Sequence, residues 1–236
     1  MKLDGAVALV TGAGKGIGRS IALSLASHGT TVALNARTES DLNAVRTEIE
    51  AAGGKAEVLP ADLRSDDALH GIFRGVDERF GRLDILVNNA GIGKFAPVRD
   101  LAVEDLDAMW DLNMRALFLC TKEAVDRMEK SGGGAIVNVA SLAGRNAFIG
   151  GAGYAATKWA LIGFSRCLML EVRDKGIRVI TICPGSVDTE FSGSRDPERA
   201  PKILAPEDVA ETVLSALRLP PRAMVSEIDI RPTNPR

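Results

Sequence analysis

Short apolar runs alternate with amphipathic stretches along the whole chain. Apolar runs that end at turns are typical of strands buried on both faces of a parallel sheet. We predict strands at 6–10, 31–36, 56–59, 84–87, 135–139, 177–182 and 225–230. The helical segments predicted between them are 19–29, 41–52, 66–80, 103–130, 154–175 and 206–219. This alternation predicts an α/β fold with one doubly wound sheet, and no linker divides residues 1–236, so we expect a single domain.

Composition and charge narrow the class of protein. The 236 residues are 46% apolar and 25% charged with a net charge of −2, which gives no indication of a nucleic-acid binder. No run of 18 apolar residues suggests a membrane span, and the N-terminus lacks the form of a secretory signal. Cys120, Cys167 and Cys183 lie far apart in apolar runs, so we expect buried thiols in a reducing, cytoplasmic compartment. No Cys/His cluster has metal-ligand spacing, and we expect no metal site.

A glycine-rich turn follows the first predicted strand. TGAGKGIG, residues 11–18, places Gly12, Gly16 and Gly18 between that strand and a helix. Glycines let the backbone approach a pyrophosphate, and the N-terminus of the following helix faces its negative charge. A tight turn without a ligand is the alternative interpretation. The strand–turn–helix context favours nucleotide binding.

The end of the second strand bears on cofactor preference. A carboxylate about twenty residues past the glycines is typical of proteins that bind NAD. Here Ala36 and Arg37 stand at that point, and Lys15 lies inside the glycine turn. Two cations without a carboxylate suit a 2′-phosphate, so the pattern favours NADP(H); solvated surface charges are the alternative.

Polar residues follow several other strands. Asp62 could accept a hydrogen bond from an adenine amino group, or cap the next helix, for which Asp66 is the better candidate. NNAG, residues 88–91, could support the sheet or contact a ligand. Val187 and Thr189 follow the sixth strand, where a nicotinamide carboxamide could hydrogen-bond. Residues 191–205 are polar and predict a mobile flap over the substrate.

Tyr154 and Lys158 are the strongest candidates for acid–base chemistry. Their spacing of four places both side chains on one face of a helix. An ammonium group lowers the pKa of a neighbouring phenol, which makes the pair a plausible proton donor. Ser141 precedes Tyr154 by 13 residues, after the fifth strand. Many surface helices carry such a pair by chance, so the interpretation depends on the context upstream.

Two predicted helices have unusual features. Asn113 lies within the predicted helix 103–130, where asparagine is a poor helix former, and indicates a local distortion or a bound water. The helix 154–175 is apolar on much of its circumference and is therefore buried in the core or against another chain. We predict a subunit contact there.

Taken together in order, these motifs resemble the short-chain dehydrogenase/reductase family over nearly the full length. The resemblance rests on TGAGKGIG, Asp62, NNAG, Asn113, Ser141, YAATK at 154–158 and PGSVDT at 184–189. It implies a Rossmann-type seven-stranded parallel sheet of order 3-2-1-4-5-6-7 and a catalytic tetrad of Asn113, Ser141, Tyr154 and Lys158. It also implies a homodimer or homotetramer formed through the helices of Asn113 and Tyr154. The positions implied to bind NADP(H) are Gly12, Gly14, Lys15, Gly16, Ile17, Gly18, Arg37, Asp62, Leu63, Asn89, Ala90, Gly91, Tyr154, Lys158, Pro184, Gly185, Val187 and Thr189.

The family resemblance implies reduction of a carbonyl compound. Tyr154 would donate the proton, Ser141 would bind the same oxygen, Lys158 would hold the nicotinamide ribose, and Asn113 would hold a water for proton resupply. The substrate stays open between a small ketone or aldehyde, a sepiapterin-type substrate and a 3-oxoacyl carrier-protein thioester. For the last, Lys94, Arg145 and Arg195 are candidate anion contacts. A protein that binds NADP(H) as a sensor without turnover is the alternative from another class.

Overall fold

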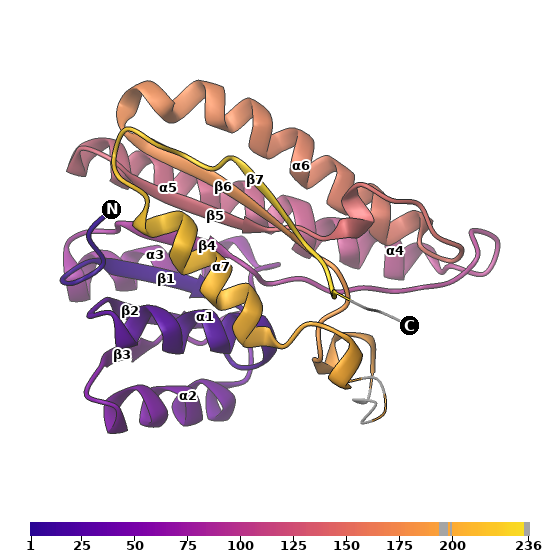
Figure 1. Cartoon of the computed structure of the whole chain (residues 1–236), viewed down its shortest axis with the longest axis horizontal. Coiled ribbons are helices and arrows are strands. Elements are labelled where there is room, and N and C mark those ends of the chain that lie inside the picture. The colour runs from indigo at the N-terminus through magenta and orange to yellow at the C-terminus, as the bar shows by residue number, and fades with distance from the viewer. Residues whose placement is uncertain (194–197, 199, 234–236) are drawn as a thin grey trace.

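Seven parallel strands form one sheet at the centre of the molecule (Figure 1). The computed structural model describes residues 1–193, 198 and 200–233. The strands are β1 (Val7–Thr11), β2 (Thr31–Asn35), β3 (Lys55–Val58), β4 (Ile85–Asn88), β5 (Gly134–Val139), β6 (Ile177–Pro184) and β7 (Glu227–Ile230). Their order is β3-β2-β1-β4-β5-β6-β7, so the predicted topology is confirmed. β1 lies in the interior, where Ala8 pairs with Val32 of β2 on one side and with Ile85 of β4 on the other.

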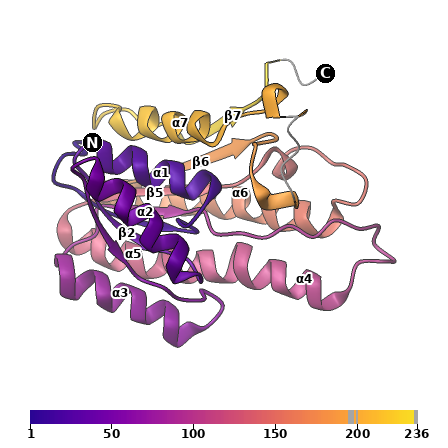
Figure 2. The same ribbon diagram turned by 90° about the horizontal axis from the view of Figure 1, so that it is seen from below.

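Helices cover both faces of the sheet. Figure 2 shows α1, α2 and α7 on one face and α3, α5 and α6 on the other. The helices are α1 (Gly16–Ser27), α2 (Glu39–Ala51), α3 (Asp66–Phe80), α4 (Val103–Trp110), α5 (Leu117–Ser131), α6 (Ala152–Val172) and α7 (Pro206–Arg218). In the described part of the chain, none of them is both long and apolar enough to cross a membrane.

Alternating strand residues supply two separate cores. Successive side chains of a strand point to opposite faces. In β1, Ala8 and Val10 join the cluster under α1, α2 and α7, whereas Leu9 joins the one under α3, α5 and α6. Both sets are fully buried, because helices cover each face. This burial explains why the strands read as continuous apolar runs rather than as alternating patterns.

The predicted helix 103–130 is interrupted at its asparagine. A π-helical turn, Asp111–Ala116, separates α4 from α5, and Asn113 lies within it. The predicted local distortion is therefore confirmed. π-turns of this kind are often found at functional sites.

Ser65, and not Asp66, caps α3. The Ser65 hydroxyl accepts a hydrogen bond from the backbone N–H of Ala68, so the prediction of Asp66 as the cap is wrong. Asp66 is the first helical residue and forms an ion pair with Arg115 of the π-turn. A carboxylate is favourable there as well, because the helix N-terminus carries partial positive charge.

Helix α6 is buried on one side only. Trp159 and Leu170 are 55% and 61% exposed, and Cys167 between them is also exposed, which corrects its prediction as a buried thiol. Cys120 and Cys183 are buried as predicted. The 3–4 residue spacing of the exposed positions forms a largely apolar stripe along the helix. Contact of this stripe with a second chain stays a prediction.

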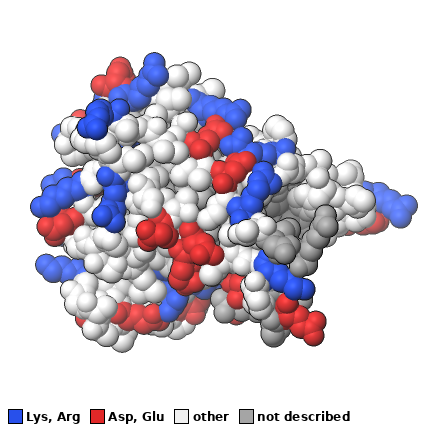
Figure 3. Space-filling model, in the orientation of Figure 1, with Lys and Arg blue, Asp and Glu red and all other residues white. Residues whose placement is uncertain are grey.

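The segment predicted as a flap is described only in part. Glu190–Ser192 and Ala200–Lys202 form short 3₁₀ turns, whereas residues 194–197 and 199 of the predicted 191–205 flap lie outside the described residues. On the face shown in Figure 3, positive and negative side chains are interspersed. No single sign of charge covers that face.

Candidate active site

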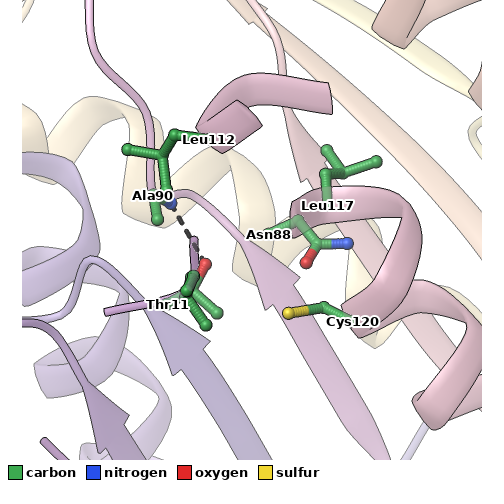
Figure 4. A pocket seen from close by; sticks show the side chains of 7 residues that line it. Thr11, Asn88, Ala90, Leu112, Leu117 and Cys120 are labelled. Atoms are coloured by element: carbon green, nitrogen blue, oxygen red, sulfur yellow. Dashed lines mark hydrogen bonds between the residues drawn. The ribbon is translucent and has the colours of Figure 1, made fainter. Parts of the chain in front are cut away.

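The carboxyl ends of β1 and β4 create a crevice at one edge of the sheet. The chain leaves β1 toward β2 on one side and β4 toward β5 on the other, so the strand order reverses between them. Ligands of open α/β sheets bind at such a point. A small pocket beside these strand ends, too small for a dinucleotide, is shown in Figure 4; it is lined by Thr11, Leu63, Asn88, Ala90, Leu112, Leu117 and Cys120.

The glycine turn leads directly into the N-terminus of α1. Gly12 and Gly16 have φ values of +64° and +55°, which glycine adopts at little cost. A Cβ atom at Gly18 would collide with the carbonyl oxygen of Gly12, so α1 packs directly on the turn. In the described part of the chain no side chain caps α1, which begins at Gly16 with Ile17 next. Its first N–H groups are thus free to bind a phosphate.

Thr11 fastens the NNAG loop to the glycine turn. The Thr11 hydroxyl donates to the carbonyl of Val87 and accepts from the N–H groups of Asn89 and Ala90. The side-chain amide of Asn89 donates to the carbonyls of Thr11 and Gly12. These bonds support the structural interpretation of the loop, while ligand contacts by Asn89, Ala90 and Gly91 stay predictions. This role of Thr11 was not predicted from the sequence, although Thr11 is the first residue of the TGAGKGIG motif.

Asn88 forms hydrogen bonds to other elements than its neighbour Asn89 does. Its amide nitrogen donates to Thr121 of α5 and to Asn138 of β5, whose own amide donates to Ser165 of α6. All four side chains are buried. This chain of hydrogen bonds ties β4 and β5 to α5 and to α6, the helix that carries Tyr154 and Lys158.

Charged groups gather at the predicted adenine end. Asp62 holds Arg64 in a two-pronged ion pair, and this hydrogen bonding with Arg64 keeps the pKa of Asp62 low. Arg37 is exposed and near enough to Asp62 to lower the same pKa further. Leu63 is buried and lines the pocket. The Asp62 carboxylate thus already has a partner in Arg64, two residues away, which the sequence did not indicate.

Lys15 has a carboxylate partner that the sequence analysis missed. Its ammonium lies 3.3 Å from a carboxylate oxygen of Glu190, and both side chains are largely exposed. Gly14 beside it packs against Asp41 of α2. The end of β2 carries no carboxylate, as predicted, but Glu190 approaches Lys15 from the segment after β6.

The segment after β6 lies against the glycine turn. Pro184 ends β6, and the N–H of Gly185 donates to the carbonyl of Ile230. Val187 forms an isolated bridge with Leu204. The side chain of Thr189 lies close to Gly16, where an added Cβ would be 3.1 Å from its methyl group. Pro184, Gly185, Val187 and Thr189 thus lie on one segment that leaves β6 beside β7 and reaches the glycine turn.

Ser141, Tyr154 and Lys158 meet beside this segment. The Ser141 side chain lies near enough to the Tyr154 hydroxyl to lower its pKa. Lys158 lies 5.8 Å from the centre of the Tyr154 ring and donates a hydrogen bond of 3.0 Å to the carbonyl of Val139. Tyr154 and Lys158 come from the first two turns of α6, and Ser141 lies two residues past the end of β5.

Burial is the main cause of the pKa shifts of Tyr154 and Lys158. It raises the pKa of Tyr154 to about 12, against a smaller lowering by the hydrogen bond with Ser141. It also lowers the pKa of Lys158 to about 8. The predicted lowering of the Tyr154 pKa by Lys158 is therefore wrong for this structure: the ammonium is too weakly coupled to the phenol to offset desolvation.

Asn113 clamps the loop that leads from β4. Its side-chain oxygen accepts from the N–H of Ile92, and its nitrogen donates to the carbonyl of Ile92 and to the Thr157 hydroxyl. Thr157 in turn donates to the carbonyl of Tyr154. The four tetrad positions are thus connected in space. Thr157, fully buried within the YAATK motif, is a further residue that the sequence analysis missed.

Two of the three candidate anion contacts already have acidic partners. Lys94 lies 3.5 Å from Asp105, and Arg145 forms ion pairs with Glu227 and Asp229 of β7. Arg195 lies outside the described residues. Arg145 therefore anchors the loop after Ser141 to the last strand.

Comparison with known proteins places this geometry in a family. The short chain dehydrogenase family model matches residues 6–200. A 3beta-hydroxysteroid dehydrogenase of Mediterraneibacter gnavus is 40% identical over 81% of this chain and 69% of its own. A sepiapterin reductase of Chlorobaculum tepidum is 34% identical over 97% and 96%, and a 3-oxoacyl-[acyl-carrier-protein] reductase of Synechocystis is 36% identical over 89% and 88%.

Solved structures agree with this assignment. An alcohol dehydrogenase of Thermococcus sibiricus, complexed with 5-hydroxy-NADP, superposes with a TM-score of 0.92 at 32% identity, covering 98% of both chains. A metagenomic short-chain oxidoreductase in complex with NADP gives 0.88 at 38% identity, covering 99% of both. The chain belongs to the short chain dehydrogenase family.

Proposed function

We propose that this protein reduces the carbonyl group of a ketone or aldehyde with NADPH. The observation that carries the proposal is the cluster of Ser141, Tyr154 and Lys158 beside the glycine turn, with the Tyr154 hydroxyl kept protonated by burial. A protonated phenol at neutral pH is suited to donate a proton.

The turn and its cations would hold the cofactor. The uncapped N-terminus of α1 and the close-packed glycines suit a pyrophosphate. Lys15 and Arg37 suit a 2′-phosphate, and two similar structures contain NADP or 5-hydroxy-NADP. When bound, the nicotinamide supplies the hydride.

The side chains of the tetrad would donate the proton to the substrate and resupply it. Tyr154 donates it to the substrate oxygen as negative charge develops there, and Ser141 stabilises the same oxygen by a hydrogen bond. Lys158, as an ammonium, holds the cofactor ribose and resupplies the proton. Both donor hydrogens of the Asn113 amide are already used, so a relay water would bind its side-chain oxygen.

A carrier-protein thioester is the weaker candidate substrate. Two of its predicted anion contacts, Lys94 and Arg145, already have acidic partners. We also propose that the exposed apolar stripe of α6, with Trp159 and Leu170, contacts a second copy of the chain.

A panel of ketones and aldehydes tests the proposed function. The purified protein should oxidise NADPH only when a carbonyl compound is present, form the corresponding alcohol, and use NADPH in preference to NADH. Tight binding of NADPH without alcohol formation from any compound would favour the sensor alternative.

A further inference from the structure

Three phenylalanines from three separate segments gather near Tyr154: Phe95 and Phe191 contact its ring, and Phe148 contacts Phe95. Phe95 precedes α4, Phe148 precedes α6, and Phe191 follows β6. The ring centres of Phe95 and Phe191 lie 5.3 Å and 5.7 Å from that of Tyr154, and Phe148 lies 6.0 Å from Phe95. These separations are typical of interacting aromatic rings.

The three rings are exposed although they are large and apolar. Phe95, Phe148 and Phe191 are 45%, 46% and 44% exposed, while the Tyr154 ring that they approach is only 7% exposed. Apolar rings that gather around one reactive group and keep an open side indicate a binding site for an apolar ligand.

Two glycines leave the space that the phenylalanine rings fill. A Cβ atom at Gly93 would lie 2.7 Å from the Phe95 ring and 2.8 Å from the Phe191 ring, so glycine is needed for both rings to come this close. A Cβ atom at Gly151, at the start of α6, would collide with the Phe148 ring. The glycines at positions 93 and 151 therefore allow the three rings to pack closely against the backbone.

Two described cations close to the phenylalanines in sequence already have acidic partners. Lys94 is next to Phe95 in sequence but is paired with Asp105, and Arg145 before Phe148 is paired with Glu227. Much of the projection at the right of Figure 3, where Figure 1 places α4 and the start of α6, is uncharged. An anionic substrate would thus leave water without gaining a free cation among these residues.

We propose that the substrate is an uncharged carbonyl compound with a flat, apolar or aryl group next to the carbonyl, held by Phe95, Phe148 and Phe191. This inference rests on the proposed function. The carbonyl carbon gains a hydride from NADPH and the oxygen gains a proton from Tyr154, so the ketone becomes an alcohol while NADPH is oxidised.

Three probe ketones test the substrate class. The value of kcat/KM with NADPH is measured for 1-tetralone, a flat aryl ketone, for 2-butanone, and for acetoacetate, which is anionic. We expect 1-tetralone to exceed the other two by at least about tenfold, as expected for more than one aromatic contact. Similar values for all three, or the highest value for acetoacetate, would overturn the substrate class while leaving the proposed function intact.

Conservative variants test the three rings. Phe95→Leu, Phe148→Leu and Phe191→Leu should each lower kcat/KM for 1-tetralone by about 3- to 10-fold and that for 2-butanone by less than about twofold. Phe80→Leu, at the far end of α3, is the matched control and should change neither. Equal losses for both ketones would contradict the role of the rings.

A binding measurement separates the two proposals. Saturation-transfer NMR of 1-tetralone with the wild-type protein should show contact, weakened in the triple phenylalanine variant and kept in Phe80→Leu. Contact without turnover of any ketone would overturn only the proposed function, and absence of contact would overturn this inference.

Discussion

The ammonium group of Lys158 donates a hydrogen bond to the carbonyl oxygen of Val139, at 3.0 Å. This bond joins the start of α6 to the end of β5, one residue before the Ala140–Ser141 turn. Because Lys158 is only 5% exposed, burial lowers its pKa to about 8, and the nearby Cys183 acts in the opposite direction. The lysine therefore titrates in the range where enzymes are assayed.

The pH dependence of carbonyl reduction should follow this lysine. We expect kcat/KM for the ketone to be level below about pH 8 and to fall above it, because the neutral amine can no longer resupply the proton. Tyr154 with a pKa of about 12 stays protonated through this range and adds no second step. A profile that stays level to pH 10 would contradict the assigned role of Lys158.

The same burial predicts how stability depends on pH. The pKa of Lys158 is about 8 in the folded state and 10.5 by its ordinary value, so between these values the unfolded chain binds more protons and stability rises with pH. From pH 7 to 9.5 the contribution is about 1–2 kcal/mol. Urea unfolding of the wild type and of Lys158→Met at both pH values measures it. An equal change in both proteins would show that Lys158 is not the cause.

Loss of the Asn113 clamp should weaken the fold. Asn113→Leu leaves the N–H and carbonyl of Ile92 without their partner in a site where Asn113 is only 1% exposed. We expect the free energy of unfolding to fall by about 2–4 kcal/mol. Asn43→Leu on the partly exposed face of α2 is the control and should cost less than about 1 kcal/mol. Equal losses for both variants would mean that the clamp adds nothing.

The ion pair between Lys15 and Glu190 should compete with the cofactor phosphate. Glu190→Gln frees Lys15, and because an exposed pair contributes up to about 1 kcal/mol, the KM for NADPH should fall about 2- to 5-fold. The KM for NADH, which lacks the 2′-phosphate, should change less. Glu48→Gln, which breaks the exposed pair with Arg19, is the control. Unchanged or weaker binding of NADPH by Glu190→Gln would show that Glu190 does not compete.

Local sequence was sufficient for the positions of the strands and of the π-turn, whereas the strand order was implied by the family resemblance. Buried parallel strands favour apolar runs, so a segment such as AVALV at 6–10 could be recognised on its own. Asn113 marked the distortion because asparagine is unfavourable within a regular helix. Both signals lie within a few residues of the feature that they indicate.

The contacts missed from the sequence join distant segments. Glu190 meets Lys15 across 175 positions, and Arg145 meets Glu227 across 82. No local pattern indicates such partners. The rise in the Tyr154 pKa has a similar origin, because it depends on burial by neighbours from several loops and not on the helical spacing to Lys158.

The central claim is that Tyr154 gives the proton to a carbonyl group reduced by NADPH. The direct measurement compares kcat for ketone reduction and the dissociation constant for NADPH in the wild type and in Tyr154→Phe. The account predicts a loss in kcat of about 10²- to 10⁴-fold with NADPH affinity nearly unchanged, because only the proton donor is removed. A variant that keeps most of the wild-type kcat would contradict it.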